Sequence, residues 1–457
     1  MGGDMLSAMK YISTVPFSGL FNWSVQYLND SKIAFSKAYP MMRIGEFLKR
    51  NKTAVAIEDD KTYKRATIKV RNGGIFLRDE EKGRNIGTKN QFLISKGQFL
   101  LSKIDARNGA FGVVPDVLDG GIITGNFWTF DVDYSIVNPH YLTLLTTTQA
   151  FVSFCEQASN GTTNRHYLQE PLFLNIKVPV PSLEEQNKLL EEYNKSMQNA
   201  KDIEFNIIIA EANLKKWIID KLSICTTQNT QSTSLIQYVR YSTINKWSTE
   251  DILKSGIYNF SQSPYNVIPI GSVVTYFEGG KTPSTSQPIF WGDDVYWVSA
   301  KDMKELYLEN IKDRLSNYGV KHSKLRVYPA GTILGVFRSG ILRHSFPICI
   351  TTTPVTINQD LKAIGVDETL IAKKFFLYYL DLLQDLVLNL CCKKGVTVES
   401  ISTECFLSVP IVCPPLDEQN NIVEHIDLVK TEILNQYKQV EEYRVMALQN
   451  FETQIFE

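Results

Sequence analysis

The stretches IKVPVPSLEEQN (Ile176–Asn187) and LSVPIVCPPLDEQN (Leu407–Asn420) repeat one pattern within this 457-residue chain. Each stretch closes a mixed globular segment and opens a long amphipathic segment. The leucines that anchor the two copies, Leu183 and Leu416, lie 233 residues apart, about half of the chain. A repeat on this scale predicts two similar modules, each followed by a helical arm.

Further landmarks keep a similar offset: Gly97 and Gly331, Gly161 and Gly395, and Ile44 and Ile270. The two glycine pairs are 234 residues apart and the isoleucine pair is 226 apart, so the second copy has gained a few residues early. Recurrent strand-and-turn chemistry, common to α/β chains, is the alternative explanation. Four ordered landmarks favour a true repeat.

Length and composition are those of a globular protein with more than one domain. The chain exceeds what one hydrophobic core usually serves, and two modules of about 180 residues fit the usual domain size. Hydrophobic residues make up 44% and charged residues 21%. No apolar run reaches the roughly 18 residues needed to span a bilayer, and the N-terminus lacks the layout of a signal peptide. We therefore expect a cytoplasmic protein.

The seven cysteines form no C-x-x-C pair and no metal-ligand spacing with the five histidines. We expect reduced thiols and no bound metal.

Positive charge is concentrated locally, although the net charge is only −1. The segment Lys61–Arg107 carries 12 basic and four acidic residues, and Lys301–Arg343 carries nine and four. The two arms carry net charges of −2 and −6. Binding to a polyanion depends on such local patches rather than on the chain total. A solvated basic surface would give the same pattern, but nucleic-acid contact is the favoured interpretation.

Hydrophobic periodicity predicts an α+β fold in each module. Short runs rich in β-branched and aromatic residues predict strands at residues 66–70, 73–77, 99–104 and 126–132, and again at 295–300, 332–337, 348–353 and 354–358. A helix is predicted after each set, at Pro139–Glu156 and at Leu370–Leu390. We divide the chain into a leader (1–38), a first module (39–180), a first arm (181–225), a linker with a second module (226–415) and a second arm (416–457).

Both arms carry apolar seams at steps of three and four residues, which require a helical partner. The first seam comprises Leu189, Tyr193, Ser196, Ala200, Ile203, Ile207, Ala210, Leu214 and Trp217. The second comprises Ile422, Ile426, Val429, Ile433, Gln436, Val440, Tyr443 and Ala447. We expect the arms to form an antiparallel coiled coil, which with the repeat gives a pseudo-twofold arrangement. Separate packing of each arm on its own module is the alternative.

The segment GGKTPSTSQPIFWGDDVYWVSAKDM (Gly279–Met303) and the P-x-L-x-E-Q-N pattern at Pro181–Asn187 and Pro414–Asn420 resemble the DNA specificity subunit of type I restriction-modification systems. The resemblance runs from about Pro40 onward. It implies two target-recognition domains separated by spacer helices, a bipartite DNA target, and no catalytic activity of the subunit's own. It also implies two methyltransferase subunits and restriction subunits as partners in phage defence. S-adenosylmethionine, ATP and magnesium are then expected on those partners.

Basic and polar residues in the predicted loops are candidates for DNA contact, by phosphate binding or by hydrogen bonds to base edges. In the first module they are Lys61, Lys64, Arg65, Lys69, Arg71, Lys82, Arg84, Lys89, Arg107, Asn108, Thr162, Thr163, Asn164, Arg165 and His166. In the second they are Lys281, Thr282, Ser284, Lys301, Lys304, Arg338, Ser339, Arg343, His344, Lys393 and Lys394. A solvated surface role is the alternative for each residue.

Apolar residues of the first arm that lie outside its seam are candidates for binding the methyltransferase subunits. We expect an exposed docking surface formed by Leu190, Phe205, Ile208 and Ile218.

Two other classes of function stay open on the sequence alone. A self-contained DNA methyltransferase or nuclease would require motifs that are incomplete. Asn138-Pro-His-Tyr141 lacks a cofactor-binding glycine motif, and Asp293, Asp294 and Asp302 lack a supporting E-x-K. Gly280-Lys281-Thr282 lacks the first glycine of a phosphate-binding loop. A helical scaffold protein that binds no DNA is the other alternative.

Overall fold

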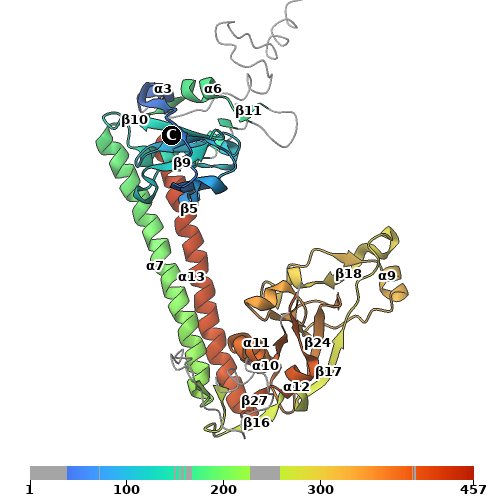
Figure 1. Ribbon diagram of the computed structural model, residues 1–457. Coiled ribbons are helices and arrows are strands. Elements are labelled where there is room, and N and C mark those ends of the chain that lie inside the picture. Colours follow the sequence, from blue (N-terminus) through green and yellow to red (C-terminus); the bar gives the residue numbers. More distant parts are fainter. Residues whose placement is uncertain are drawn as a thin grey trace, which may run out of the picture. The chain divides into compact units, whose positions relative to one another are not determined.

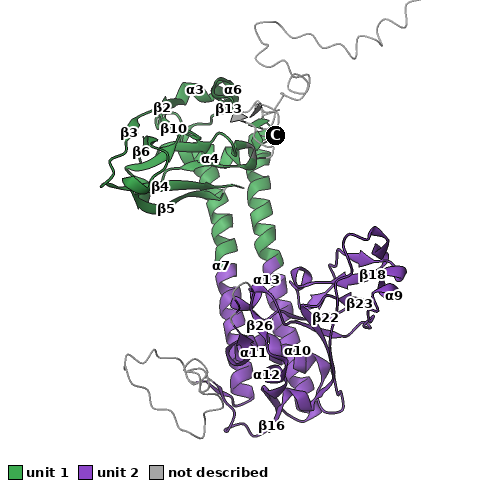
Figure 2. Cartoon of the chain, turned by 45° about the vertical axis from the view of Figure 1, so that its right-hand side comes forward, with its two compact units in different colours: residues 1–203, 438–457 green, residues 204–437 purple. Residues whose placement is uncertain are grey.

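The computed structural model describes residues 39–70, 73–148, 151–152, 154–155, 159–160, 167–226, 258–393, 395 and 398–456 (Figure 1). The chain divides into two compact units, residues 1–203 with 438–457 (unit 1) and residues 204–437 (unit 2) (Figure 2). The predicted leader and residues 227–257 lie outside the described residues. Among the described residues, no helix combines the length and the apolar character needed to cross a membrane.

Unit 1 is built on a four-stranded antiparallel sheet. Its order is β2 (Leu48–Asn51), β10 (Phe127–Val132), β7 (Phe99–Ser102) and β8 (Phe111–Val113). Phe99, Phe111, Trp128 and Phe130 of these strands are buried together with residues of helix α4 (Pro139–Thr146) and helix α6 (Glu170–Asn175). Burial of such large apolar side chains is the main source of stability for this core, at roughly 1.5–3 kcal/mol each.

A second, five-stranded sheet in unit 1 carries the basic segment. Its order is β3 (Ala54–Ala56), β6 (Asn90–Ile94), β9 (Gly121–Thr124), β4 (Thr62–Lys69) and β5 (Gly74–Lys82). Strands β4 and β5 form a long antiparallel ribbon with a bulge between Arg65 and Ala66. A bulge leaves one extra residue unpaired and re-aims its side chain; here that residue is Arg78, because Arg65 pairs with Asp79 and Ala66 with Leu77.

Unit 2 contains a five-stranded and a three-stranded sheet. The first has the order β17 (Val274–Gly279), β24 (Leu361–Val366), β21 (Ile333–Val336), β22 (Ile348–Thr351) and β19 (Tyr307–Leu308). The second has the order β20 (Arg314–Leu315), β18 (Trp291–Val298) and β23 (Val355–Ile357). Among the described residues, the short helices of this unit include α9 (Asn317–His322), α10 (Lys373–Leu382), α11 (Gln384–Cys391) and α12 (Thr403–Ser408). Helices α10, α11 and α12 contribute to its hydrophobic core.

The two units repeat one arrangement of strands. The order β2–β10–β7–β8 of unit 1 corresponds to β17–β24–β21–β22 of unit 2. Each unit also has a two-stranded sheet, β1 (Met41–Arg43) with β13 (Lys177–Pro179), and β16 (Asn266–Pro269) with β27 (Pro410–Cys413). Gly97 and Gly331 both have positive φ, at 80° and 82°. The predicted repeat and the α+β class are confirmed.

The arms are the long helices α7 (Leu183–Lys221) and α13 (Leu416–Phe456), which pair in both units. In unit 1, Ser196 Oγ donates a hydrogen bond to the carbonyl of Tyr443 (3.2 Å). In unit 2, the rings of Trp217 and His425 stack with centroids 3.9 Å apart. Glu418 of α13 pairs with the last residue of α7, at 2.7 Å. Residue numbers rise along one helix as they fall along the other, so the predicted antiparallel pair is confirmed.

Both helices predicted to follow the sheets are shorter than expected. Helix α4 ends at Thr146, and helical residues follow at 151–152 and 154–155, so the predicted helix to residue 156 is interrupted. The hydroxyls of Thr146, Thr147 and Thr148 donate to the carbonyls three residues earlier, at 2.6–2.8 Å. Three consecutive β-branched residues that bond to their own backbone interrupt the helix at this point. The predicted helix 370–390 is two helices, because Leu383 between α10 and α11 has φ −109° and ψ 28°.

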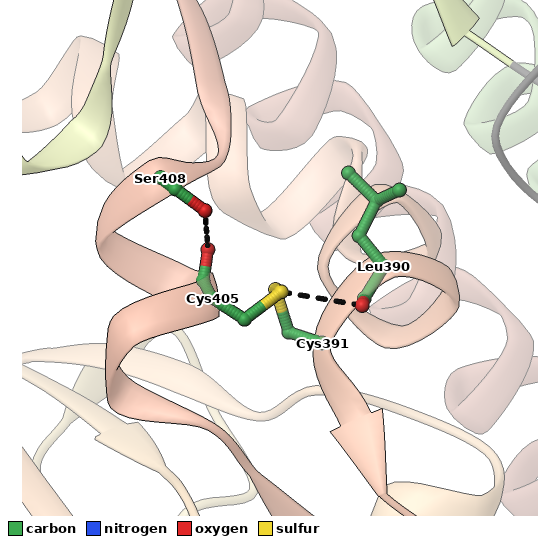
Figure 3. Close-up of a disulfide and its surroundings, with 4 residues drawn as sticks. All are labelled: Leu390, Cys391, Cys405 and Ser408. Atoms are coloured by element: carbon green, nitrogen blue, oxygen red, sulfur yellow. Dashed lines mark hydrogen bonds between the residues drawn. A yellow bond between two sulfur atoms is a disulfide. The ribbon is translucent and has the colours of Figure 1, made fainter. Parts of the chain in front are cut away.

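The expectation of reduced thiols is wrong for one pair of cysteines. Cys391, at the end of α11, and Cys405, in α12, form a disulfide with Cα atoms 5.3 Å apart (Figure 3). Ser408 Oγ donates to the carbonyl of Cys405 (2.7 Å) in the same helix. Spacing along the sequence did not reveal this pair, because packing of α11 against α12 brings the residues together.

Candidate nucleic-acid interface

A buried glutamine ties the start of α7 to the sheet of unit 1. The side chain of Gln186 has no exposed surface. Its Nε2 donates to the carbonyls of Pro181 (2.8 Å) and Ile136 (3.0 Å), and its Oε1 accepts from the amide of Asn138 (2.8 Å). These bonds join the helix start to the segment that leads from β10 into α4.

Unit 2 repeats this arrangement atom for atom. Gln419 is also fully buried. Its Nε2 donates to the carbonyls of Pro414 (2.8 Å) and Leu370 (3.0 Å), and its Oε1 accepts from the amide of Ala372 (2.7 Å). The glutamine of the P-x-L-x-E-Q-N pattern therefore has a structural role, which is to fix each helical arm to its own module.

In each module, a short two-stranded hairpin is hydrogen-bonded to the loop that follows a strand of the main sheet. In unit 1, β11 (Ser159–Asn160) pairs with β12 (Tyr167–Leu168), and the amide of Leu168 donates to the carbonyl of Lys103 after β7 (2.9 Å). In unit 2, β25 (Cys392–Lys393) pairs with β26 (Ser400–Ile401), and the amide of Ile401 donates to the carbonyl of Phe337 after β21 (2.9 Å). We call residues 103–110 with 159–168 loop pair 1, and residues 337–345 with 392–401 loop pair 2.

Loop pair 1 contains several of the predicted base contacts. Asn108 is exposed at the end of the short 3-10 turn Ala106–Asn108, and its amide donates to the carbonyl of Asp105 (2.8 Å). The turn ends at Gly109, whose φ of 72° favours glycine. The side chain of Arg107 and the predicted contacts Thr162, Thr163, Asn164, Arg165 and His166 lie outside the described residues.

Loop pair 2 gathers the predicted contacts of the second module. Arg338, Arg343 and His344 are exposed, Ser339 is half-buried, and Lys393 is exposed in β25. Lys394 lies outside the described residues.

Glu399 lies at the centre of loop pair 2. Its carbonyl accepts from the amide of Ser339 (3.1 Å), and its Oε1 accepts from Nε of Arg343 (2.7 Å). This hydrogen bond from the guanidinium holds the pKa of the Glu399 carboxyl below its usual value.

The β4–β5 ribbon of unit 1 and the turns beside it position the other basic candidates. They are Lys61, Lys64, Arg65, Lys69, Lys82, Arg84 and Lys89, whereas Arg71 lies outside the described residues. Arg65 is half-buried and bonds Asp79 through Nε (2.6 Å) and Nη2 (2.8 Å). These bonds lower the pKa of Asp79. Lys89 Nζ lies 2.8 Å from Asp59 Oδ1. Arg65 and Lys89 are thus already paired with carboxylates.

A hollow of about 300 Å³ lies beside the bulge of this ribbon. Arg65 and the bulge residue Arg78 line it, together with Thr88, Gln91 and Phe127. Arg78 was not predicted as a site residue, because the bulge that turns it toward the hollow has no signal in the sequence.

The remaining candidates of unit 2 are exposed, and several are engaged locally. Thr282 Oγ1 donates to Gln359 Oε1 (2.6 Å), and the hydroxyls of Ser284 and Ser286 are 2.8 Å apart. Lys281 is exposed. Lys301 Nζ donates to Asp313 Oδ2 (2.7 Å), which raises the pKa of that lysine. Lys301 and Lys304 line a hollow of about 360 Å³ that also contains four acidic residues, Asp302, Glu305, Glu309 and Asp313.

Comparison with known proteins identifies the family. The family model of the type I restriction modification DNA specificity domain matches residues 36–192 and 262–442. This chain belongs to that family. The expected family is therefore confirmed, and the two matched segments coincide with the repeated modules and the starts of their helices.

The similar proteins include specificity subunits of type I restriction enzymes. The specificity subunit of the Escherichia coli type I restriction enzyme EcoR124I/EcoR124II is 31% identical over 35% of this chain. The match spans only 40% of that relative's length. The HindI specificity subunit of Haemophilus influenzae is 23% identical over 70% of this chain and 77% of its own length.

A solved structure described as "Structural basis underlying complex assembly and conformational transition of the type I R-M system" shares the fold. It is similar over 92% of this chain and 98% of that chain, with a TM-score of 0.58 and 16% identity.

Two of the four predicted docking residues of helix α7 are exposed. The exposed fraction is 63% for Phe205 and for Ile208. Ile218 is fully buried in the core of unit 2, and Leu190 is half-buried against the core of unit 1. The prediction that these two residues are exposed is wrong, because α7 packs against the core of unit 1 near Leu190 and against the core of unit 2 near Ile218. The most exposed apolar residue of α13, Leu428 at 72%, was missed.

Two of the three aspartates that could suggest a nuclease site, Asp294 and Asp302, have structural roles. Asp302 Oδ2 accepts from the amide of Ser299 (2.9 Å) at the start of a short helical turn. Asp294 Oδ2 accepts from the amide of Asn317 (2.8 Å). Within the part of the chain that the structure describes, no three His, Cys, Asp or Glu side chains are grouped so that they could hold a metal ion.

Proposed function

We propose that this chain is the non-catalytic, sequence-specific DNA-binding subunit of a type I restriction-modification complex. One observation carries the proposal: two modules with the same frame present equivalent loop pairs whose residues differ. Modules of one fold with different contact residues suit a target of two unlike half-sites. The family match supports this function.

The proposed domain organisation follows the repeat. Residues 39–180 and 226–415 form the target-recognition domains, and residues 181–225 and 416–457 form the spacer helices. The pairing of α7 with α13 in each unit supports a spacer made of two helices. The leader, residues 1–38, has no assigned role.

The proposed partners are double-stranded DNA, two methyltransferase subunits and restriction subunits. S-adenosylmethionine, ATP and magnesium would bind to those partners, and the assembly would work in the cytoplasm, where DNA and ATP are available. The exposed side chains of Phe205 and Ile208 support a protein partner on α7, since large apolar residues that are solvent-exposed side by side often mark interaction sites.

Methyl transfer to DNA tests this function directly. The purified chain is expected to transfer no methyl group from S-adenosylmethionine to duplex DNA. Addition of the methyltransferase subunits should produce methylation at one bipartite sequence, mapped by sequencing of methylated adenines. Methyl transfer by the chain alone, or tight binding of S-adenosylmethionine to it, would overturn the assignment in favour of a self-contained enzyme.

Duplex binding separates the proposal from a scaffold role. The complex should bind its target with an affinity that falls steeply as salt rises, because phosphate contacts release counterions. A complex that binds no duplex at any salt concentration would favour a scaffold that does not act on DNA.

A further inference from the structure

Arg343 and Glu399 form a directed pair at the surface of loop pair 2. The side chain of Arg343 is 53% exposed, whereas that of Glu399 is only 7% exposed. Nε of Arg343 donates to Oε1 of Glu399 at 2.7 Å. The backbone of Glu399 is fixed as well, since its carbonyl accepts from the amide of Ser339 at 3.1 Å. The guanidinium is therefore anchored at one edge and open to solvent elsewhere.

Nη1 and Nη2 of Arg343 are the groups of an arginine that can bind a planar pair of acceptors. Among the described residues, none accepts a hydrogen bond from Nη1 or Nη2 of Arg343. Two parallel N–H donors from one arginine match the O6 and N7 acceptors of guanine in the major groove. Anchoring through Nε fixes the plane of the fork before DNA binds, so less side-chain freedom is lost on contact.

The charge of the pair favours a base over a phosphate. Arg343 and Glu399 carry opposite charges, so together they contribute little to the neutralisation of phosphates on which non-specific binding depends. The N–H donors of Nη1 and Nη2 stay available after Glu399 has compensated the charge of Arg343. A phosphate contact needs charge more than orientation, whereas recognition of a base edge needs orientation.

We propose that Arg343 recognises a guanine in one half-site of the DNA target, and that Glu399 is the positioning residue that orients it. This inference rests on the proposed DNA-binding function and names a specific contact within it. His344 is adjacent to the pair and exposed, so it can face the same groove.

In the described part of the first module, the position that matches Arg343 holds a different residue. With the 234-residue offset of the glycine pairs, Arg343 corresponds to Gly109. Gly109 has no side chain with which to donate a hydrogen bond. The guanine contact is therefore expected in only one of the two half-sites.

The test is a binding selection from a random duplex library, using the full chain in complex with its methyltransferase subunits. The wild-type complex should select a bipartite motif that contains a guanine in one half-site. Arg343→Ala should remove the preference for guanine at that position, with a loss of about 5- to 150-fold in discrimination. The other half-site should be unchanged.

Two further variants test the role of Glu399 and the need for a fork. Glu399→Gln retains the shape of the side chain but removes the charge, and it should weaken discrimination at the same position only. Arg343→Lys should not restore discrimination, because a lysine offers no planar pair of donors. Lys393→Ala, at an exposed lysine of the same loop pair, is the control for loss of positive charge and should lower affinity equally for all sequences. Thermal unfolding of each variant excludes misfolding as the cause of a loss.

The outcomes separate this inference from the function on which it rests. If the wild-type complex selects no motif, the DNA-specificity function itself fails. If it selects a motif and Arg343→Ala lowers affinity equally for every sequence, Arg343 contacts phosphate and the inference alone is wrong. A selected motif that Arg343→Ala leaves unchanged also overturns it.

Discussion

Loop pair 1 turns at Gly109 with a left-handed backbone, whereas the matching position of loop pair 2 holds Arg343 bonded to Glu399. Behind these loops, the buried side chains of Gln186 and Gln419 make the same three hydrogen bonds. The frame is repeated because buried polar groups need fixed partners. The loops can differ because exposed side chains such as those of Asn108 and Arg343 do not pack in a core, so they are free to suit the two unlike half-sites that we propose.

The largest expected effect comes from the seam of the paired helices. Ile207 is 1% exposed, whereas its neighbour Ile208 is 63% exposed. Ile207→Ala should reduce the free energy of unfolding by about 2–4 kcal/mol, because it leaves a cavity in the seam. Ile208→Ala should change it by less than about 0.5 kcal/mol. Chemical denaturation of both variants measures the difference, and equal effects would contradict the buried seam.

The repeated glutamines should be nearly equivalent in energy. Gln419→Ala leaves two carbonyls and one amide without their partner, which should reduce the free energy of unfolding by about 2–3 kcal/mol. Gln186→Ala should have a similar effect in unit 1. Asn420→Ala, at an exposed position beside Gln419, is the control and should be close to neutral. A large effect in only one module would show that the two frames are not equivalent.

The outer face of α7 should matter for assembly rather than for folding. Ile208→Glu places a charge on the exposed apolar surface and should weaken binding of the methyltransferase subunits by about tenfold or more. The unfolding temperature of the free chain should not change. Analytical ultracentrifugation or calorimetry of the mixture measures this, and an unchanged affinity would mean that the subunits bind elsewhere.

The smallest expected effect distinguishes two adjacent cations of the β4–β5 ribbon. No described residue forms an ion pair with Lys64, whereas Arg65 is bonded to Asp79. Lys64→Ala should reduce the slope of log affinity against log salt by about 1, since one phosphate contact is lost. Arg65→Ala should reduce it less, because Asp79 already compensates that charge. Equal salt slopes for the two variants would contradict the expectation that pairing with Asp79 reduces the contribution of Arg65 to DNA binding.

Sequence patterns were sufficient for elements that depend on local or periodic signals. The strands around residues 99–104 and 126–132, and the seams of the arms, follow from hydrophobic periodicity. Termination of α4 after Thr146 was missed because side-chain hydrogen bonds to the backbone compete with helix without altering the apolar pattern. The contact residues of the loops stay predictions. The sequence showed that these residues are basic or polar, but it did not show which of them form hydrogen bonds or ion pairs within the protein.

The sequence by itself determined the duplicated α+β modules, the paired helices and the family, because each is encoded by residues that recur at a set spacing. Only the tertiary structure decided which charged residues are paired and which apolar residues of the arms are buried. Arg65 is paired with Asp79 from the neighbouring strand, Arg343 with a carboxylate 56 residues away, and Ile218 is buried in a core. Spacing along the chain carries no information about such partners, since they meet only when separate elements pack together.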